Sequence, residues 1–594
     1  MVLGRQQTDA SVQDPRGPQW TGSRRVDWCP PLVLNLAMAL QHVLVQCSLL
    51  VLTVGMLQCR LQWTVAQRGQ HLASLLFSSA LATLLHTCTG SCLPLMQAPS
   101  LEMLVPALVL LSAKTGNEED CRGQYSETER CDAQGSAERE LQGMVVVAGL
   151  LQVCVGVCGL GGVCLRRCGP LVLAPLLCVL GLSIYREAAL LCSDHWGFAA
   201  LAVFLMVILS QHLRSVSFSA LPDFVQFPFY SMLSVLLPVL IVWGVCVLLE
   251  FSGHLQLHTL SDLLPDPGVQ NETAPRLLND THTHTVLSSG PSLKHSGTLP
   301  WISLPHTGVW RPLLSGRATA AGVAAALGSC CSSMAVYCLS SRFLGAPQPP
   351  AHACNRGLLS EGLATLTSAL LGSTLGVVSS TANVCTLELS QCGSRRTVQL
   401  AAILGLLLGL SPRLTVLLSS IPLVIYGAIL CVTYAVATAT GVTYFQYGHM
   451  DSGRNIFNIG FTTFMALVLP RWFRLQPDVL SIGQSSANVF LLSVLTSPML
   501  LIFLMAFLLE NSVSGSLAER GLTRVEGKRG ETMLVLSDGR QNHDERDATY
   551  EPPYVVRRLL AMPYLRVVPF YACRLPDRQE VATPTQEMTN LLAV

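Results

Sequence analysis

Long runs of hydrophobic residues, separated by short polar stretches, repeat along most of the chain. A helix that crosses a bilayer needs roughly 20 apolar residues. Five runs approach or exceed that length without a break, at residues 32–57, 144–165, 229–251, 318–339 and 489–509. Other runs are shorter or are interrupted by glycine and proline, at residues 72–85, 93–111, 171–184, 198–208, 358–378, 398–421, 423–442 and 456–469. The pattern therefore predicts a bundle of membrane-spanning helices.

One stretch places polar side chains inside this apolar sequence. Ser379, Ser380, Thr381 and Asn383 follow directly on the run at 358–378. An unpaired polar group in an apolar environment costs on the order of several kcal/mol, so we expect this stretch to line a cavity. Irregular backbone at the middle of a membrane is typical of transporter binding sites. With this segment, the chain is predicted to have about fourteen membrane segments.

Composition and charge narrow the class of protein. Half of the 594 residues are hydrophobic and 12% are charged, which is typical of a polytopic membrane protein. The formal net charge is +1, so no basic surface indicates nucleic acid as a partner. The sequence contains no nucleophile elbow, phosphate loop or histidine pair at helical spacing. We therefore expect a lipid-embedded protein that is not an enzyme and has no metal site or organic cofactor.

Two signals predict how the chain is oriented in the membrane. Asn271 and Asn279 each begin a glycosylation sequon in one long polar loop, which favours an extracellular position for that loop. The short loops that then fall in the cytoplasm carry the expected arginine excess. These arginines are Arg166, Arg167, Arg214, Arg342, Arg356, Arg395 and Arg396. Both termini are then cytoplasmic, and the charged C-terminal tail is expected to be loosely ordered.

Two shorter patterns each have a functional and a neutral interpretation. Cys121 and Cys131 share a polar loop, so they could pair as a disulfide if that loop is extracellular. Most of the 22 cysteines lie in apolar runs and are expected to be buried thiols. Glu587 with Leu591 and Leu592 matches an acidic dileucine sorting signal, although such a short pattern also arises by chance.

A series of landmarks occurs in a characteristic order along the chain. They are Gln41-His42, Leu-Pro-Leu-Met-Gln-Ala at 93–98, Gly-Ala-Pro-Gln-Pro-Pro at 345–350, Asn-Arg-Gly at 355–357, Gly-Ser-Arg-Arg at 393–396 and Asp-Ser-Gly-Arg-Asn at 451–455. In these features the chain resembles the nucleobase/ascorbate transporter family, from about Pro30 to Leu522. Gln-Ala-Pro-Ser-Leu-Glu at 97–102 narrows the resemblance within that family.

The resemblance implies an all-α fold of two inverted seven-helix repeats, divided into a core and a gate domain. The third and tenth segments would be half helices whose N-termini meet at the midplane and offer free N–H groups to a ligand. A plasma-membrane homodimer with sodium as coupling ion is also implied. The chain would then divide into a cytoplasmic tail (1–30), a first transmembrane repeat (31–251), an extracellular glycosylated loop (252–305), a second transmembrane repeat (306–510) and a cytoplasmic tail (511–594).

The chain departs from the family pattern at the positions that matter for substrate and ion. Family transporters carry a glutamate in the eighth helix that hydrogen-bonds the base, and an aspartate one turn later that is linked to cation coupling. The matching residues are Ser332 and Val336. Leu101 stands where an aromatic side chain stacks on the base, and of the tenth-segment motif only Asn383 is retained. Both base recognition and sodium coupling are expected to be altered.

Two carboxylates stand where the family has small residues. Glu388 either reaches water near the cytoplasmic end of its helix or acts within the membrane. Glu102 lies one turn into the third half helix, where an intramembrane carboxylate is by default a functional candidate. The residues expected to face the substrate are Gln97, Ala98, Ser100, Leu101 and Glu102, with Ser332 from the eighth helix and Ser380, Thr381, Ala382 and Asn383 from the tenth segment.

The sequence thus predicts a transporter of a small-molecule substrate, with a purine nucleobase such as hypoxanthine or xanthine as the leading candidate. A first alternative is transport of ascorbate or another organic anion. A second alternative is a transport-silent relative that acts as a receptor or assembly partner, because both eighth-helix carboxylates are missing.

Overall fold

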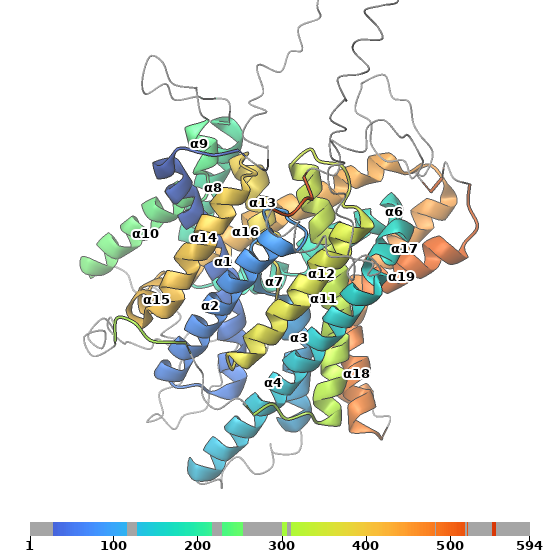
Figure 1. Cartoon of the computed structure of the whole chain (residues 1–594), viewed down its shortest axis with the longest axis horizontal. Coiled ribbons are helices and arrows are strands. Elements are labelled where there is room, and N and C mark those ends of the chain that lie inside the picture. The colour runs from blue at the N-terminus through green and yellow to red at the C-terminus, as the bar shows by residue number, and fades with distance from the viewer. Residues whose placement is uncertain are drawn as a thin grey trace, which may run out of the picture.

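The hydrophobic runs form helices that pack side by side in the computed structural model (Figure 1). The structure describes residues 26, 28–115, 127–214, 216, 228–253, 300–305, 311–480, 483–516, 519–520 and 549–553. Within these residues, seven helices are long and apolar enough to cross a membrane, or up to nine if two bent pairs each count as one span. These helices support the predicted polytopic all-α membrane protein.

The first half of the described chain consists of helices with one short strand. They are α1 (Leu32–Leu61), α2 (Val65–Thr89), β1 (Gln97–Pro99), α3 (Leu101–Thr115), α4 (Glu127–Cys158), α5 (Leu160–Arg167), α6 (Pro170–Leu182), α7 (Tyr185–Cys192), α8 (Trp196–Val207), the π-helix η3 (Ile208–His212), α9 (Phe229–Met232) and α10 (Leu236–Phe251).

The second half repeats this composition. Its elements are α11 (Gly316–Phe343), α12 (Ala351–Leu370), β2 (Val377–Ser379), α13 (Thr381–Ser390), α14 (Arg395–Leu410), α15 (Pro412–Ser419), α16 (Leu423–Tyr444), the 3-10 helix η6 (Phe445–Tyr447), α17 (Gly453–Leu475), the 3-10 helix η7 (Pro477–Val479), α18 (Ser485–Thr496) and α19 (Pro498–Ser512).

Several elements differ from the sequence prediction. The run at 489–509 is not one straight span, because α18 and α19 meet at an angle of 79° where Pro498 begins a new helix. The run at 398–421 bends by 104° before Pro412 for the same reason, since proline lacks the N–H that would continue the preceding helix. Helix α4 begins at Glu127, so Cys131 lies in a helix rather than a loop. Arg356, expected in a short loop, is buried within α12.

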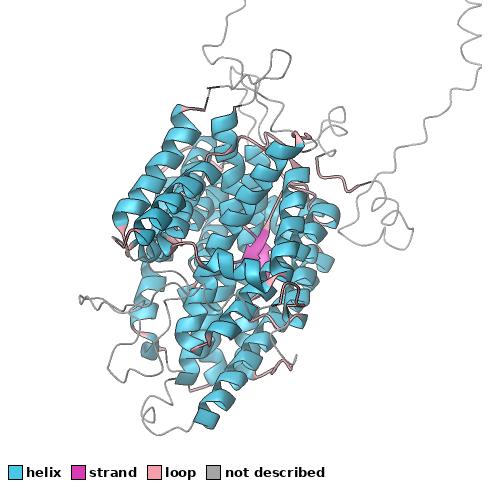
Figure 2. Ribbon diagram, turned by 90° about the vertical axis from the view of Figure 1, so that its left-hand side faces the viewer, coloured by secondary structure: helices cyan, strands magenta, loops and turns pink. Residues whose placement is uncertain are grey.

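Helices from the two halves pack against each other in reciprocal pairs. Helix α4 packs on α12 and α2 packs on α14, while α3 packs on α11 and α1 packs on α13. Helices α6 and α16 pack on each other. The two strands pair antiparallel in the middle of the molecule (Figure 2), so the segment before α3 meets the segment before α13. Each half therefore completes its packing with the corresponding elements of the other.

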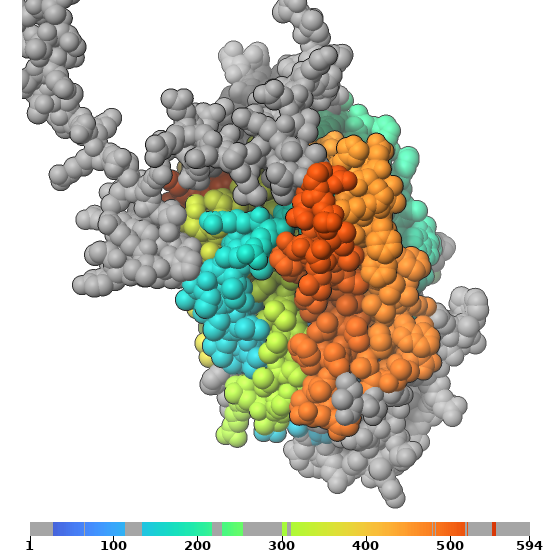
Figure 3. Space-filling view, turned by 90° about the vertical axis from the view of Figure 1, so that its right-hand side faces the viewer, coloured from blue at the N-terminus to red at the C-terminus, as the bar shows by residue number. Residues whose placement is uncertain are grey.

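The outer surface has the character that a bilayer requires. The last helices of the bundle, coloured orange to red, form part of the face shown in Figure 3, beside helices coloured cyan and green. Helix α17 exposes large apolar side chains there, including Phe457, Phe461, Phe464 and Trp472. Lipid, unlike water, solvates such side chains without an energetic cost.

Glycines allow α4 and α12 to approach at backbone distance. A Cβ atom at Gly362 would lie 2.6 Å from the backbone nitrogen of Val153 and 2.9 Å from the carbonyl oxygen of Gly149. A Cβ atom at Gly156 would lie 2.7 Å from the backbone nitrogen of Leu359. Because backbone atoms cannot move aside as a flexible side chain can, these glycines set the distance between the two helices.

We expect Gly362→Ala to destabilise the protein by about 1–3 kcal/mol, because the added methyl group forces α4 and α12 apart. Gly460→Ala in α17 is the matched control, since a Cβ atom there meets nothing within 4 Å. Alanine is otherwise the better helix former, so the control should be neutral or slightly stabilising. Thermal unfolding of the detergent-solubilised variants checks this, and equal midpoints would contradict the close-packing argument.

Candidate functional site

The paired strands bring the ends of two short helices together at the centre of the bundle. Gln97 pairs with Ser379 and Ala98 with Val378, and α3 and α13 begin directly after the strands. The Ser380 hydroxyl accepts a hydrogen bond from the backbone N–H of Asn383, which caps the start of α13. The first turn of a helix has N–H groups without partners in the helix. Both helix N-termini therefore direct such groups toward the same region.

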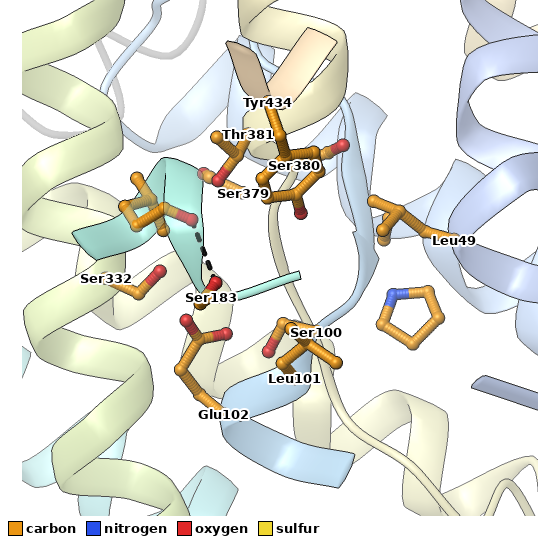
Figure 4. Close-up of a pocket in the computed structure, with 13 residues that line it drawn as sticks. Leu49, Ser100, Leu101, Glu102, Ser183, Ser332, Ser379, Ser380, Thr381 and Tyr434 are labelled. Carbon is orange, nitrogen blue, oxygen red and sulfur yellow. Dashed lines mark hydrogen bonds between the residues drawn. The ribbon is translucent and has the colours of Figure 1, made fainter. Parts of the chain in front are cut away.

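A small pocket lies at these two helix N-termini (Figure 4). Its volume is about 10 Å³, which is close to the minimum for one water molecule. A ligand the size of a nucleobase can therefore enter only if lining elements move apart. The lining residues are Leu49 of α1, Leu180 of α6 and Ser183 after it, Ser332 of α11, Tyr434 of α16, the segment Ala98, Pro99, Ser100, Leu101 and Glu102, and the segment Ser379, Ser380 and Thr381.

Seven of the ten residues expected to face a substrate line this pocket. They are Ala98, Ser100, Leu101, Glu102, Ser332, Ser380 and Thr381. The buried side chains of Gln97, Ala382 and Asn383 are not among the lining residues.

Gln97 and Asn383 instead bond within the walls of the pocket. Gln97 Nε2 donates to Ser379 Oγ at 3.0 Å, and Gln46 Nε2 donates to the Gln97 carbonyl at 2.8 Å. Asn383 Nδ2 donates to Ser380 Oγ at 3.1 Å, and its Oδ1 lies 3.2 Å from His42 Nδ1. These bonds connect the strand pair and the start of α13 to α1.

Other sequence candidates lie elsewhere. Glu388 is on α13 with its side chain 27% exposed and forms a 3.4 Å ion pair with Arg214, which follows η3. It therefore reaches solvent, away from the pocket. The side chain of Cys131, together with Cys121, Asn271, Asn279, Glu587, Leu591 and Leu592, lies outside the described residues.

Glu102 is the one carboxylate among the residues that line this pocket. It is 6% exposed, and in Figure 4 its carboxylate points toward Ser183 and Ser332. The Ser332 hydroxyl is close enough to form a hydrogen bond with it. Glu102 also borders a second small pocket, whose lining includes Arg474 of α17 and Ser497. A negative charge at this place is favoured by the N-terminus of α3.

Several residues of the site were not singled out from the sequence, and Tyr434 and Glu361 are the most informative of them. Tyr434 places an aromatic ring against the pocket beside Thr381 (Figure 4), whereas the sequence pattern predicted no aromatic side chain there. Glu361 of α12 is fully buried behind the pocket. A carboxylate in the apolar run 358–378 was the available signal for Glu361.

The Glu361 carboxylate accepts hydrogen bonds from three hydroxyl groups, two on α11 and one at the end of β2. Its Oε1 accepts from the Tyr337 hydroxyl at 2.7 Å and from Ser379 Oγ, and its Oε2 accepts from Ser333 Oγ. Because Ser379 lines the pocket and pairs with Gln97, this network ties α11 and α12 to the strand pair. Hydrogen bonds to a carboxylate are about twice as strong as neutral ones, so the network holds the pocket wall firmly.

The helical bundle with a central polar pocket is the architecture of a multi-pass membrane protein. Residues 35–475 match the family model Xan_ur_permease, described as Permease family. Solute carrier family 23 member 3 of Mus musculus is 42% identical over 535 residues, which cover 86% of this chain and 81% of that protein. Solute carrier family 23 member 1 of Mus musculus is 31% identical over 533 residues, which cover 86% of this chain and 84% of that protein.

A plant relative extends this comparison. Nucleobase-ascorbate transporter 12 of Arabidopsis thaliana is 26% identical over 507 residues, covering 81% of this chain and 68% of that protein. The chain belongs to the nucleobase/ascorbate transporter family, solute carrier family 23. The resemblance inferred from the ordered landmarks is confirmed, and the 42% identity to member 3 agrees with the narrower resemblance that residues 97–102 indicated.

We expect Glu361→Ala to destabilise the protein by about 1–3 kcal/mol for each buried hydroxyl that loses its acceptor. Glu361→Gln, which keeps the shape and one acceptor oxygen, should be milder. Glu388→Ala serves as the control because its carboxylate is partly exposed. Thermal unfolding followed by size-exclusion chromatography measures the loss. If Glu361→Ala and the control unfold at the same temperature, the network does not stabilise the fold.

Proposed function

We propose that this protein is a secondary transporter whose substrate is a purine nucleobase, with hypoxanthine or xanthine as the leading candidate. The observation that carries the proposal is the convergence of two helix N-termini and the Glu102 carboxylate on one central pocket. Backbone N–H groups at these N-termini suit the oxo groups of the base. The Glu102 carboxylate suits a ring N–H, in place of the eighth-helix glutamate that is Ser332 here.

The arrangement of helices supports the finer architecture that the family implies. We propose fourteen membrane segments in two inverted repeats, because the reciprocal packing of α4 with α12 and of α2 with α14 is what an inverted repeat produces. The sequons and the arginine-rich loops support cytoplasmic termini and an extracellular loop at 252–305. A homodimer in the plasma membrane completes the proposal and rests on family resemblance.

The closed pocket suggests how access alternates. Most lining residues come from α3, α11 and α13 or the strands before them, whereas Leu180, Ser183 and Tyr434 come from α6, the turn after it, and α16. We assign the first group to the core domain and the second to the gate domain. Sliding of one domain along the other would widen the pocket at one end at a time.

Sodium coupling is proposed to be weaker than in relatives that retain the acidic pair. Val336 is fully buried and apolar, and a hard cation requires oxygen ligands. Flux by exchange or facilitated diffusion is the expected consequence.

Uptake of radiolabelled hypoxanthine, xanthine and ascorbate into expressing cells, with sodium or choline in the medium, tests the proposal. Saturable purine uptake that changes little with choline is expected. Saturable ascorbate uptake without purine uptake would favour the organic-anion alternative. No uptake of any solute, despite normal surface expression, would favour the transport-silent alternative. Steep sodium dependence would contradict the weakened coupling.

We expect Glu102→Gln to raise the KM for purine at least threefold, because the amide keeps the shape but loses the charge that receives a ring N–H. Glu102→Ala should reduce uptake roughly tenfold or more, in line with the loss of a charge-assisted hydrogen bond. Glu388→Gln is the matched control, since its ion pair lies away from the pocket. Each uptake rate is normalised to the amount of that variant at the cell surface. Wild-type kinetics in both Glu102 variants would remove this carboxylate from the substrate site.

A further inference from the structure

A short piece of the C-terminal tail is docked against the helices, although the sequence predicted a loosely ordered tail. Tyr550 is 1% exposed and lies in the same buried cluster as Tyr337, Phe343 and Ala353. Burial of an aromatic side chain to this extent is typical of a specific contact. Residues 549–553 therefore form a defined interaction with the body of the protein.

Three segments of the helical body hold this piece by hydrogen bonds. The Tyr550 hydroxyl donates to the carbonyl of Pro347, in the connection between α11 and α12. Arg356 Nη2 of α12 donates to the Tyr550 carbonyl at 2.6 Å, and Arg395 Nη2 of α14 donates to the Thr549 carbonyl at 3.1 Å. Two of these bonds use the backbone of the tail and one uses its tyrosine side chain.

Arg356 connects the docked tail to the packing of α12 against the end of α2. Its side chain is buried, and its Nε donates to the Gly90 carbonyl at 3.0 Å, directly after α2. A buried guanidinium is costly unless its N–H groups find acceptors. The Tyr550 carbonyl is one of these acceptors, so the docked tail stabilises the bond between α12 and the end of α2.

The docked segment is close in structure to the walls of the substrate pocket. Gly90 lies in the stretch between α2 and β1, whose partner strand β2 ends at the pocket residue Ser379. Tyr337, which shares the cluster with Tyr550, donates to Glu361, and Glu361 accepts from Ser379. Arg356 thus links the docked segment directly to the stretch that leads into β1, and the buried cluster of Tyr550 also includes a residue that bonds Glu361.

We propose that residues 549–553 are an intrachain ligand for a groove formed by Pro347, Arg356 and Arg395, and that their docking positions the strand pair for substrate binding. The groove takes a tyrosine whose ring is buried and whose backbone carbonyls face two arginines. Because the tail belongs to the same chain, its effective concentration is high, and a few hydrogen bonds suffice. Tyr550 is then a positioning residue. The transport part of this proposal rests on the proposed function, whereas docking itself does not.

Photo-cross-linking of the full chain in membranes tests docking. Pro347 has an exposed side chain, so it can be replaced by p-benzoylphenylalanine without filling the core. Irradiation should cross-link it to a peptide containing residues 549–553, identified by mass spectrometry. Adding Tyr550→Ala should lower the yield at least fivefold, while Pro553→Ala, at an exposed position of the same segment, should not. Absence of the tail peptide, or an equal yield with Tyr550→Ala, would overturn the docking.

Uptake kinetics at equal surface expression test positioning. Tyr550→Ala should raise the KM at least threefold, and Tyr550→Phe, which keeps the ring and loses one hydrogen bond, should raise it less. Pro553→Ala should behave like wild type. A mere stabilising role would change the number of surface transporters and leave the KM unchanged, which would refute positioning. If the wild type moves no solute, the proposed function and the positioning claim both fail, while the cross-link still decides docking.

Discussion

The need to satisfy backbone hydrogen bonds inside an apolar bundle governs the centre of this protein. A helix that begins in the middle of a membrane leaves N–H groups without partners, which is tolerated only where the backbone lines a cavity. Here the strands β1 and β2 pair with each other before α3 and α13 begin. The backbone N–H and C=O groups of the segments that lead into both helices therefore find partners in each other. The N–H groups left at the helix starts are then available to a ligand.

Close packing of backbones keeps this arrangement in place. Helices α4 and α12 touch through Gly149, Gly156 and Gly362, and α12 carries Glu361, whose carboxylate holds the strand pair through Ser379. A change in the distance between α4 and α12 would therefore be passed to the pocket wall. In lipid, where apolar surface gives no preference for helix contact, such close approach and interhelical hydrogen bonds supply the specificity.

The sequence predicted the membrane helices and the interrupted tenth segment because both follow from local hydrophobicity. It also indicated Glu102, since an isolated carboxylate in an apolar segment is a strong signal. Glu361 carried the same signal, but its role depends on Tyr337 and Ser379, which only the packed structure brings to it. The docking of Tyr550 could not be predicted, because a charged tail has no periodic pattern of apolar residues. In addition, the sequence pattern placed Arg356, the partner of Tyr550, in a loop, whereas it lies in α12.

The contacts between helices differ in how readily they can be exchanged. Buried bonds such as those of Glu361, which join α12 to α11 and β2, resist rearrangement. The ion pair between Glu388 and Arg214, which joins α13 to the segment after η3, is partly exposed on both sides. Such pairs are worth about 0–1 kcal/mol. A second pocket is lined by Glu102 of α3 together with Arg474 of α17. Buried bonds also cross between the two groups of pocket-lining helices, because the Tyr444 hydroxyl of α16 donates to the Cys338 carbonyl of α11. The sliding proposed above would therefore have to exchange such buried bonds as well as exposed ion pairs.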